Sequence, residues 1–302
     1  MTYHVPAMVQ EVLDGLKINP EGIYVDVTFG GGGHSKAILQ KLNSKGRLIA
    51  FDQDENAFQN QIQDDRFLLI QSNFRYLKRF LKFYEITGID GLLADLGVSS
   101  HQLDKPERGF AFKHQDINLP LDMRMNLQQS RTAADVLNQT EASRLETIFK
   151  EYGEIWNAAK LVKAIEQYKA RSPILTIGQL VTVASGTAIG PVHQYLAKTF
   201  QALRIEVNDE LLALEQLLED SVELLNPGGR LVVISYHSLE DRLVKRIIQA
   251  GNVKGITRQD SFGNKINKLV AVSKKTIQPS EEEIKENYRV RSARLRIAEK
   301  LA

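Results

Sequence analysis

Four consecutive glycines follow directly on a short apolar segment, and this junction limits the possible folds more than any other feature. Residues 22–29 (GIYVDVTF) have the composition of a buried strand, residues 30–33 are all glycine, and residues 35–42 (SKAILQKL) place apolar side chains at helical spacing. Such a junction forms a nest of backbone N–H groups that a nucleotide-like ligand can approach closely, because glycine tolerates positive φ and has no Cβ. Taken alone, the loop fits a tight structural turn equally well.

The same alternation of strands and helices continues on both sides of a helical region. Further strands are predicted over residues 46–51, 67–71, 89–95, 230–236, 269–272 and 294–297. Between about residues 130 and 199 the apolar side chains recur at helical spacing, with almost no strand signal. A helix over about residues 208–225 should end at residues 226–229 (NPGG). We therefore predict one α/β domain with a parallel sheet, interrupted by a helical insertion.

Two acidic residues indicate what the glycine loop binds. Asp26 lies in the first predicted strand and Asp52 closes the second, where an acid can accept both ribose hydroxyls of an adenosine ligand. The loop lacks the third glycine of the dinucleotide pattern G-x-G-x-x-G, and His34 stands where a Walker loop needs lysine. S-adenosylmethionine remains, because it offers an adenosine and carries no phosphate. The alternative for Asp52 is a turn or helix cap.

Composition excludes several classes of site and location. The chain has no cysteine, which rules out disulfides, zinc–cysteine sites and thiolate nucleophiles. It shows no complete set of metal ligands, so we expect no metal, although magnesium carried by RNA stays open. No apolar run is long enough for a membrane span and no secretory signal is visible at the first residues, so we expect a cytoplasmic protein without membrane contact. A net charge of +2 does not by itself indicate a nucleic-acid partner.

Seven longer strings make the chain resemble a known family. They are residues 24–35 (YVDVTFGGGGHS), 94–100 (ADLGVSS), 107–110 (ERGF), 119–125 (LPLDMRM), 199–205 (TFQALRI), 235–242 (SYHSLEDR) and 291–298 (RSARLRIA). In order and spacing they resemble the bacterial small-subunit ribosomal RNA (cytosine-N4) methyltransferases, the MraW family. The resemblance spans nearly the whole chain.

The resemblance implies a class I, Rossmann-like S-adenosylmethionine methyltransferase sheet with an inserted all-helical domain. We expect the methyltransferase domain in residues 1–104 and 206–302, and a mainly helical substrate-recognition domain in residues 105–205. The implied reaction moves a methyl group to the N4 amine of a cytosine in small-subunit (16S) ribosomal RNA, in the decoding centre. The implied partners are the small ribosomal subunit and its RNA, contacted by the helical insertion and residues 289–296. No obligate protein partner is evident, and a homodimer stays open.

The resemblance also assigns a cofactor site. The implied S-adenosylmethionine contacts are Gly32, Gly33, His34, Asp52, Phe74, Asp95 and Gln102. Asp52 would hold the ribose, Phe74 would lie near the adenine, and Asp95 would stand at the carboxyl end of a strand, where open α/β sheets bind ligands. Taken singly, His34 could simply begin a helix, Phe74 could belong to the core and Gln102 to a loop. Family members often carry a larger residue at the second glycine, here Gly31.

The chemistry needs an acceptor near the amine, because the lone pair of cytosine N4 is delocalised into the ring. Other amino-methyltransferases place an Asp/Asn/Ser-Pro-Pro-aromatic motif after the fourth strand, but residues 95–98 (DLGV) lack the prolines and the aromatic residue. We predict contacts near the acceptor base from Asp95, Asp122 and His237. Asp122 could instead pair with Arg124, and residues 238–241 (SLED) read as a helix-capping box. Methylation at carbon 5 of cytosine needs a cysteine thiolate, which this chain lacks.

Three other functions fit parts of the sequence. The same scaffold could methylate amino groups in DNA or another RNA, which a comparison of duplex DNA with small ribosomal subunits separates. A ribosome-assembly factor could bind S-adenosylmethionine without turning it over, which labelled methyl transfer distinguishes. A nicotinamide dehydrogenase is the most distant alternative, because the loop lacks the third glycine of the dinucleotide pattern.

Overall fold

A computed structural model describes residues 6–112, 118–257, 259–263 and 266–302 of the chain. The chain divides into two compact units, one formed by Met1–Gly97 with Leu211–Ala302 and the other by Val98–Glu210. Residues 1–5, on which part of the expectation about a secretory signal falls, lie outside the described residues. Within the described part, no helix combines the length and the apolar character of a membrane span.

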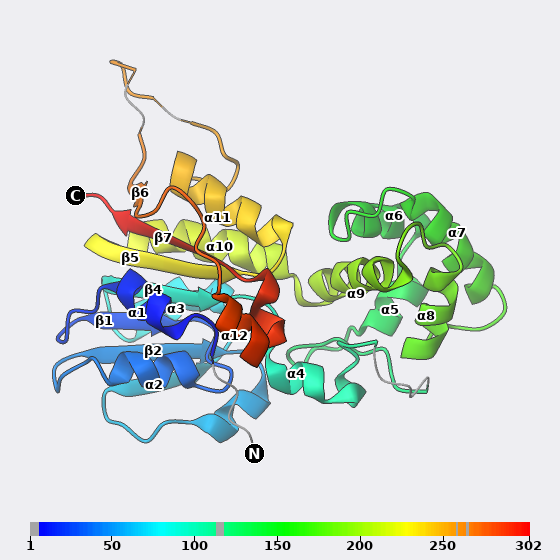
Figure 1. Cartoon of the computed structure of the whole chain (residues 1–302), viewed down its shortest axis with the longest axis horizontal. Coiled ribbons are helices and arrows are strands. Elements are labelled where there is room, and N and C mark those ends of the chain that lie inside the picture. The colour runs from blue at the N-terminus through cyan, green and yellow to red at the C-terminus, as the bar shows by residue number, and fades with distance from the viewer. Residues whose placement is uncertain (1–5, 113–117, 258, 264–265) are drawn as a thin grey trace. The chain divides into compact units, whose positions relative to one another are not determined.

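The first unit is built on a seven-stranded sheet with the order β3-β2-β1-β4-β5-β7-β6 (Figure 1). Its strands are β1 (Ile23–Asp26), β2 (Arg47–Asp52), β3 (Phe67–Gln71), β4 (Ile89–Asp95), β5 (Leu225–Ser235), β6 (Leu269–Ala271) and β7 (Arg294–Lys300). The first five strands pair in parallel, and β7 pairs antiparallel with both β5 and β6. This open, mainly parallel arrangement confirms the predicted Rossmann-like α/β class.

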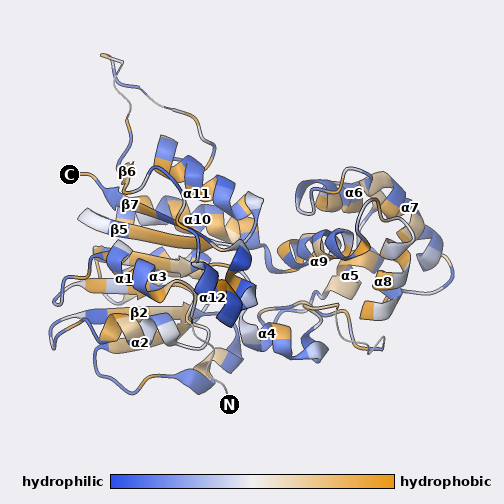
Figure 2. Ribbon diagram, in the orientation of Figure 1, coloured by the Kyte–Doolittle hydropathy of each residue, from blue (hydrophilic) through white to orange (hydrophobic). Residues whose placement is uncertain are grey.

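Side chains alternate between the two faces of the sheet, as strand geometry requires. In β4, Leu92 and Ala94 join one apolar core while Leu93 joins the core of the opposite face. In β5, Val233 and Val232 divide in the same way. Both faces are apolar because both are covered by helices, and Figure 2 shows the strands predominantly in the colours of hydrophobic residues.

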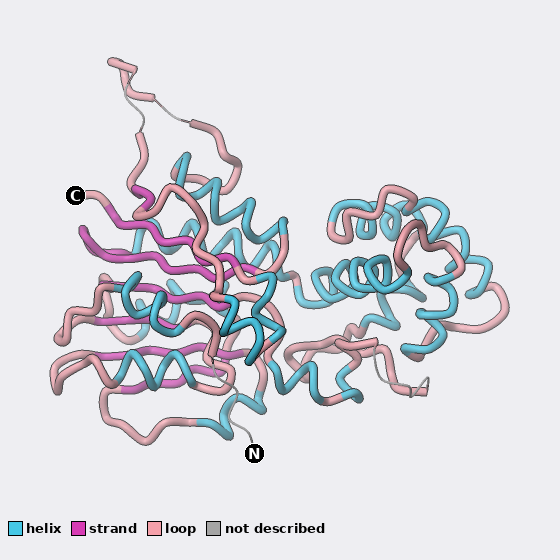
Figure 3. The backbone as a smooth tube through the Cα atoms, viewed as in Figure 1, coloured by secondary structure: helices cyan, strands magenta, loops and turns pink. Residues whose placement is uncertain are grey.

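Helices form the layers above and below this sheet (Figure 3). One core includes side chains of α3 (Leu77–Phe83), α10 (Glu210–Leu224) and α11 (Ser238–Ala250). The opposite core includes side chains of α1 (Val9–Leu16) and α2 (Gly33–Leu39), with α12 (Glu281–Glu286) packed against it through Ile284. The first unit is therefore a three-layer α/β/α structure.

The long helix ends at Leu224 as α10, next to its predicted stop, but the strand after it begins earlier than predicted. Residues 226–229 (NPGG) belong to β5, which was expected to start at residue 230. Asn226 donates a side-chain hydrogen bond to Asp90 at 3.0 Å, and the register between β4 and β5 shifts between Ile89 and Gly91. An irregularity in the ladder thus lets the strand begin before the glycines.

The second unit is helical and has its own core. Its helices are α4 (Ser100–Asp104), α5 (Ala133–Gln139), α6 (Ala142–Glu151), α7 (Ala158–Lys169), α8 (Ile177–Ser185) and α9 (Val192–Asn208). Capping boxes at Thr132 and Thr176 begin α5 and α8 by satisfying free N–H groups of the first turn. The helical insertion is thus present.

The borders of this unit lie at different residues from those expected. The chain enters it at Val98 instead of residue 105, because Val98 and Leu103 already pack against the helical core. It leaves after Glu210 instead of residue 205, because α9 continues and the Arg204 guanidinium holds both Glu210 oxygens at 2.9 Å. Gln102 therefore belongs to the helical unit.

Candidate functional site

Three parallel strands of the first unit each end in an aspartate. Asp26 ends β1, Asp52 ends β2 and Asp95 ends β4, so the three carboxylates share the carboxyl edge of the sheet. The strand order reverses between β1 and β4, which makes this edge the topological switch point where open α/β sheets bind ligands. The glycine loop leaves β1 at the same edge. Sequence spacing and sheet topology therefore indicate the same site.

The glycine loop is held by its own backbone and by Asp52. Gly30 donates its N–H to Asp52 Oδ2 at 2.8 Å, and Gly32 donates to the Phe29 carbonyl at 2.8 Å. Gly30 and Gly32 have φ values of 52° and 74°, a region that suits glycine. A Cβ on Gly31 would meet nothing within 4 Å, so the loop surface at this position is open. A larger side chain therefore has room at this position.

We expect Gly32→Ala to destabilise the protein by about 1–3 kcal/mol, the usual cost of a left-handed conformation in a residue with a Cβ. The new Cβ would also lie 2.8 Å from the Phe29 ring, which would have to move. Gly31→Ala is the matched control, with little expected change. Urea unfolding of the two variants checks the difference. Equal stabilities would contradict the loop geometry.

Asp52 is a partly buried carboxylate fixed by backbone donors. Its Oδ1 accepts the N–H of Asp54 at 2.8 Å while its Oδ2 accepts that of Gly30. Burial raises the pKa of Asp52 to about 6, against the lowering effect of these hydrogen bonds. Burial likewise raises the pKa of Asp26, whose Oδ2 accepts a hydrogen bond from Ser35 at 2.7 Å. At this edge, the hydrogen bonds that the carboxylates accept therefore do not fully offset the effect of burial on their pKa values.

Asp95 lies in a small hydrogen-bonding network. Its Oδ1 accepts the Tyr236 hydroxyl proton at 2.9 Å, and its Oδ2 lies 3.8 Å from His34 Nδ1, too far for a hydrogen bond. Burial raises the pKa of Asp95 to about 6, while the nearby His34 acts in the lowering direction. His34 Nε2 is 2.7 Å from the carbonyl oxygen of Ala7, which can only accept, so Nε2 carries a proton. One Asp95 oxygen is thus left for a ligand.

A sequence profile of the MraW methylase family matches residues 1–301 of the chain. The chain belongs to the MraW methylase family. A Bacteroides fragilis protein named ribosomal RNA small subunit methyltransferase H is 51% identical over 305 residues, which cover 99% of this chain and 98% of the relative. A Flavobacterium johnsoniae protein of the same name is 50% identical, with 100% of this chain and 99% of the relative covered.

The resemblance inferred from the seven strings is thereby confirmed. This MraW methylase is an S-adenosylmethionine-dependent methyltransferase. The crystal structure of an rRNA methylase from Streptococcus thermophilus aligns with 14% identity and a TM-score of 0.42, covering 100% of this chain and 99% of that one. The fold assignment accordingly rests on the strand order described above.

The residues at the edge fit S-adenosylmethionine better than a phosphate-bearing nucleotide. Asp26 raises the pKa values of Asp52 and Asp95 through like-charge repulsion, in addition to the larger effect of burial. An added phosphate would increase this repulsion, whereas a sulfonium cation and hydroxyl donors would relieve it. The open backbone at Gly31 completes a site for an adenosine ligand with a positive charge.

Two expected cofactor contacts lie in different surroundings. Phe74 begins a short 3-10 turn (Phe74–Tyr76) just after β3 and packs against the core under the sheet. The Asn73 side chain donates to Gln53 at 2.9 Å, which ties this turn to the residue after Asp52. Gln102 belongs to the helical unit, where it is buried and completes the capping box of Ser99. Phe74 thus lies beside the end of β2, whereas Gln102 has a structural role in α4.

Asp122 pairs with Arg124, as the alternative stated in the sequence analysis expects. Arg124 Nε and Nη2 donate to the two Asp122 oxygens at 2.8 and 2.7 Å. The same guanidinium also donates to the carbonyl oxygens of Leu127 and Gln129. This bidentate pair organises the loop before α5 within the helical unit.

His237 is itself the N-cap of α11, so the expected capping box at Ser238 is wrong by one residue. Its Nδ1 accepts the N–H of Glu240 at 3.5 Å, and the Glu240 carboxylate accepts the N–H of Tyr236 at 2.8 Å. The imidazole Nε2 lies 3.1 Å from Glu240 Oε1, an ion-pair distance without hydrogen-bond alignment. The structure gives His237 a helix-capping role next to Tyr236.

Sequence reasoning missed Tyr236 as a site residue. It follows β5 directly, and its hydroxyl reaches across to Asp95 at the end of the neighbouring β4. Burial and the adjacent carboxylate raise its pKa, so the hydroxyl stays protonated and donates. Its position just after a strand at the sheet edge was the available signal, because β4 and β5 were both predicted strands.

Proposed function

We propose that this MraW methylase transfers a methyl group from S-adenosylmethionine to the N4 amine of a cytosine in small-subunit (16S) ribosomal RNA, in the decoding centre. The observation that carries the proposal is the Asp95 carboxylate, which has one oxygen held by Tyr236 and the other left for a donor. The names of the relatives support the RNA substrate. The absence of cysteine supports attack by the amine instead of carbon 5.

Asp95 would act as the acceptor for the reacting amine. S-adenosylmethionine supplies an electrophilic methyl group when bound, so the protein has mainly to orient N4 in line with it. Asp95 Oδ2 would accept an N4 proton and favour the positive charge that develops on nitrogen. A pKa of about 6 leaves the carboxylate ionised at neutral pH, yet basic enough to take that proton. Tyr236 would keep the carboxylate oriented as its positioning residue.

The other predicted site residues receive narrower roles. Gly32, Gly33 and His34 would line the cofactor through the loop and the start of α2, and Phe74 would contact the adenine. Asp52 would accept the ribose hydroxyls in addition to its backbone donors. Gln102, Asp122 and His237 would act as positioning residues, because each is engaged within its own local structure.

The remaining parts of the chain would serve RNA recognition. The helical unit would contact the ribosomal RNA. The RNA would offer the target cytosine either from a loop or as a base displaced from its stack. The arginines of residues 289–296 lie at the start of β7 and just before it. Arg296 donates to both oxygens of Asp241, and Arg291 donates to the Tyr288 hydroxyl. The protein would act on ribosomal subunits in the cytoplasm, with a homodimer left open.

The affinity for S-adenosylmethionine should rise with pH more steeply than that for S-adenosylhomocysteine. Asp52 and Asp95 have pKa values of about 6, so raising pH through 6 ionises them, and only S-adenosylmethionine brings a sulfonium to offset the charge. Between pH 5 and 7.5 we expect the affinity ratio to increase about tenfold, equivalent to one pKa unit of coupling. Calorimetric titration of both ligands measures it. A ratio independent of pH would contradict the placement of the sulfonium near these carboxylates.

The acceptor is tested by labelled methyl transfer to four substrates in parallel. Small ribosomal subunits from a strain lacking this enzyme, large subunits, duplex DNA and transfer RNA each receive the protein and labelled S-adenosylmethionine. The proposal expects label in the small-subunit RNA. Label in DNA or another RNA would replace the substrate but keep the enzyme class. Tight cofactor binding without transfer to any acceptor would favour an assembly factor.

A further inference from the structure

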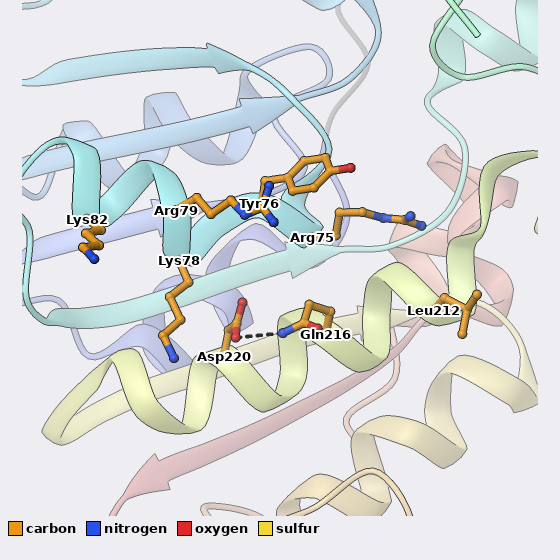
Figure 4. A pocket seen from close by; sticks show the side chains of 8 residues that line it. All are labelled: Arg75, Tyr76, Lys78, Arg79, Lys82, Leu212, Gln216 and Asp220. Atoms are coloured by element: carbon orange, nitrogen blue, oxygen red, sulfur yellow. Dashed lines mark hydrogen bonds between the residues drawn. The ribbon is translucent and has the colours of Figure 1, made fainter. Parts of the chain in front are cut away.

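A cationic groove lies between α3 and α10, on the first unit and outside the cofactor edge (Figure 4). Its volume is about 550 Å³. It is lined by Arg75, Tyr76, Lys78, Arg79, Lys82, Leu212, Gln216 and Asp220. Figure 4 shows the basic side chains extending from α3 and the turn before it, with the α10 side chains facing them. We call these eight residues the cationic groove.

The basic residues form a stripe along one face of the helix. Lys78, Arg79 and Lys82 are spaced by one, three and four residues along α3, which places them on the same side, and Arg75 precedes them in the 3-10 turn. Lys78, Arg79 and Lys82 are exposed and Arg75 is half-buried. At 1.5 Å per residue the stripe is roughly 10 Å long. That length matches two or three consecutive phosphates of one nucleic-acid strand, at roughly 3.4 Å of axial rise each.

The opposite face of the same helix explains why the stripe points outward. Leu77 and Leu81 are fully buried in the core under the sheet, so α3 cannot rotate its basic side chains inward. The orientation of the stripe is therefore fixed by packing, and its exposed cations are held at one surface without a cost from burial.

Acidic residues offset only part of this charge. Lys78 pairs with Glu223, and the effect of this partner raises the Lys78 pKa. Asp220 accepts a hydrogen bond from Gln216 at 2.9 Å, and burial raises its pKa, which favours the uncharged form. Exposed ion pairs such as Lys78–Glu223 are weak and exchange readily for a phosphate partner. The four cations of the stripe thus outnumber the neighbouring carboxylates Glu219, Asp220 and Glu223.

The groove begins where the cofactor edge ends. Arg75 directly follows Phe74, and Asn73 bonds to Gln53 beside Asp52. Tyr76 is 40% exposed, and the Arg79 guanidinium stacks over its ring at 5.3 Å from the centroid. An exposed aromatic ring interleaved with cations is the combination with which proteins hold single-stranded nucleic acid.

We propose that the cationic groove binds the sugar–phosphate backbone of ribosomal RNA, several nucleotides away from the cytosine that reacts. The proposal rests on the proposed function, because it extends the RNA substrate of that site. The contact recognises phosphates and therefore contributes affinity and register instead of base specificity. Its position on the methyltransferase unit gives the RNA a second anchor that does not depend on the helical insertion.

The test compares two double charge reversals. Arg79→Glu/Lys82→Glu alters the groove, whereas Lys41→Glu/Arg47→Glu alters exposed cations after α2 and at the amino end of β2. Methyl transfer to small ribosomal subunits gives the KM for subunits at several salt concentrations. We expect the groove variant to raise this KM about tenfold near 0.1 M salt and the control to change it less than twofold. The KM for S-adenosylmethionine should stay unchanged in both.

A neutral variant and a second probe separate failure of the groove proposal from failure of the proposed function. Arg79→Gln/Lys82→Gln should lower the slope of log affinity against log salt by about 1.4, since each contact to single-stranded phosphate contributes roughly 0.7. Binding of a fluorescent single-stranded RNA oligonucleotide by the full-length protein tests the groove even if wild type methylates no small subunit. Equal effects of groove and control variants on both probes would overturn the groove. So would weakened binding with an unchanged salt slope, which indicates a protein contact.

Discussion

Asp95→Ala is expected to lower kcat for methyl transfer by about 10²–10³, at saturating S-adenosylmethionine and small subunits. The substitution removes the acceptor that would orient N4 and offset its developing charge, and single groups of this kind contribute factors of that size. The Tyr236 hydroxyl would also lose its partner at 2.9 Å. Single-turnover kinetics measure the chemical step apart from binding.

The pH profile separates chemistry from damage to the fold. With wild type, the single-turnover rate should rise as pH passes through about 6, because the reacting form of Asp95 is the ionised one. Asp95→Asn should be slow and lack this rise. Tyr236→Phe should retain more activity, about a tenfold loss, because it removes only the hydrogen bond that orients the carboxylate. An Asp95→Ala variant with normal kcat would exclude Asp95 as the acceptor.

Asp52→Ala is expected to weaken S-adenosylmethionine binding by about 10- to 100-fold, since hydrogen bonds to a charged group contribute about 1.5–3 kcal/mol. The variant removes the acceptor for the ribose hydroxyls and the anchor of the Gly30 N–H. Calorimetric titration measures the dissociation constant. Once S-adenosylmethionine saturates the variant, kcat should recover most of its value, unlike that of Asp95→Ala.

Measured stability and a matched control variant show whether Asp52→Ala weakens S-adenosylmethionine binding through the lost contact or through a damaged fold. Asp65→Ala removes an exposed carboxylate after the turn that follows β2 and should leave affinity unchanged. For Asp52, burial raises the folded-state pKa, so its ionisation opposes folding as pH rises from about 4 to 6. Asp52→Asn removes this charge but replaces one acceptor oxygen with an NH2 donor, so it should bind weakly with little net change in stability at pH 7. Normal affinity in both Asp52 variants would contradict the ribose assignment.

The sheet and its ligand edge were predictable because local patterns and topology agree there. Each of β1, β2 and β4 is an apolar run ending in aspartate, and parallel strands bring their carboxyl ends to one edge. Periodicity alone was sufficient to locate the helical insertion, because α5 to α9 each bury one apolar stripe.

Features that depend on tertiary contacts were missed or misplaced. Tyr236 reaches Asp95 across 141 positions of sequence, which no local pattern encodes. The N-P-G-G segment indicates a helix stop, but the sequence does not show that pairing with β4 extends β5 through it. The N-cap of α11 is His237 instead of the predicted Ser238, because an imidazole nitrogen can accept an N–H as a serine hydroxyl does.

The most direct test of the account identifies the methylated nucleoside. Small ribosomal subunits from a strain lacking this enzyme are incubated with the protein and S-adenosylmethionine carrying a heavy-isotope methyl group. The RNA is digested to nucleosides, and chromatography with fragmentation separates N4-methylcytidine from its isomer methylated at carbon 5. The account predicts the heavy methyl group in N4-methylcytidine. Its appearance in 5-methylcytidine or in another nucleoside, or no transfer at all, would contradict the central claim.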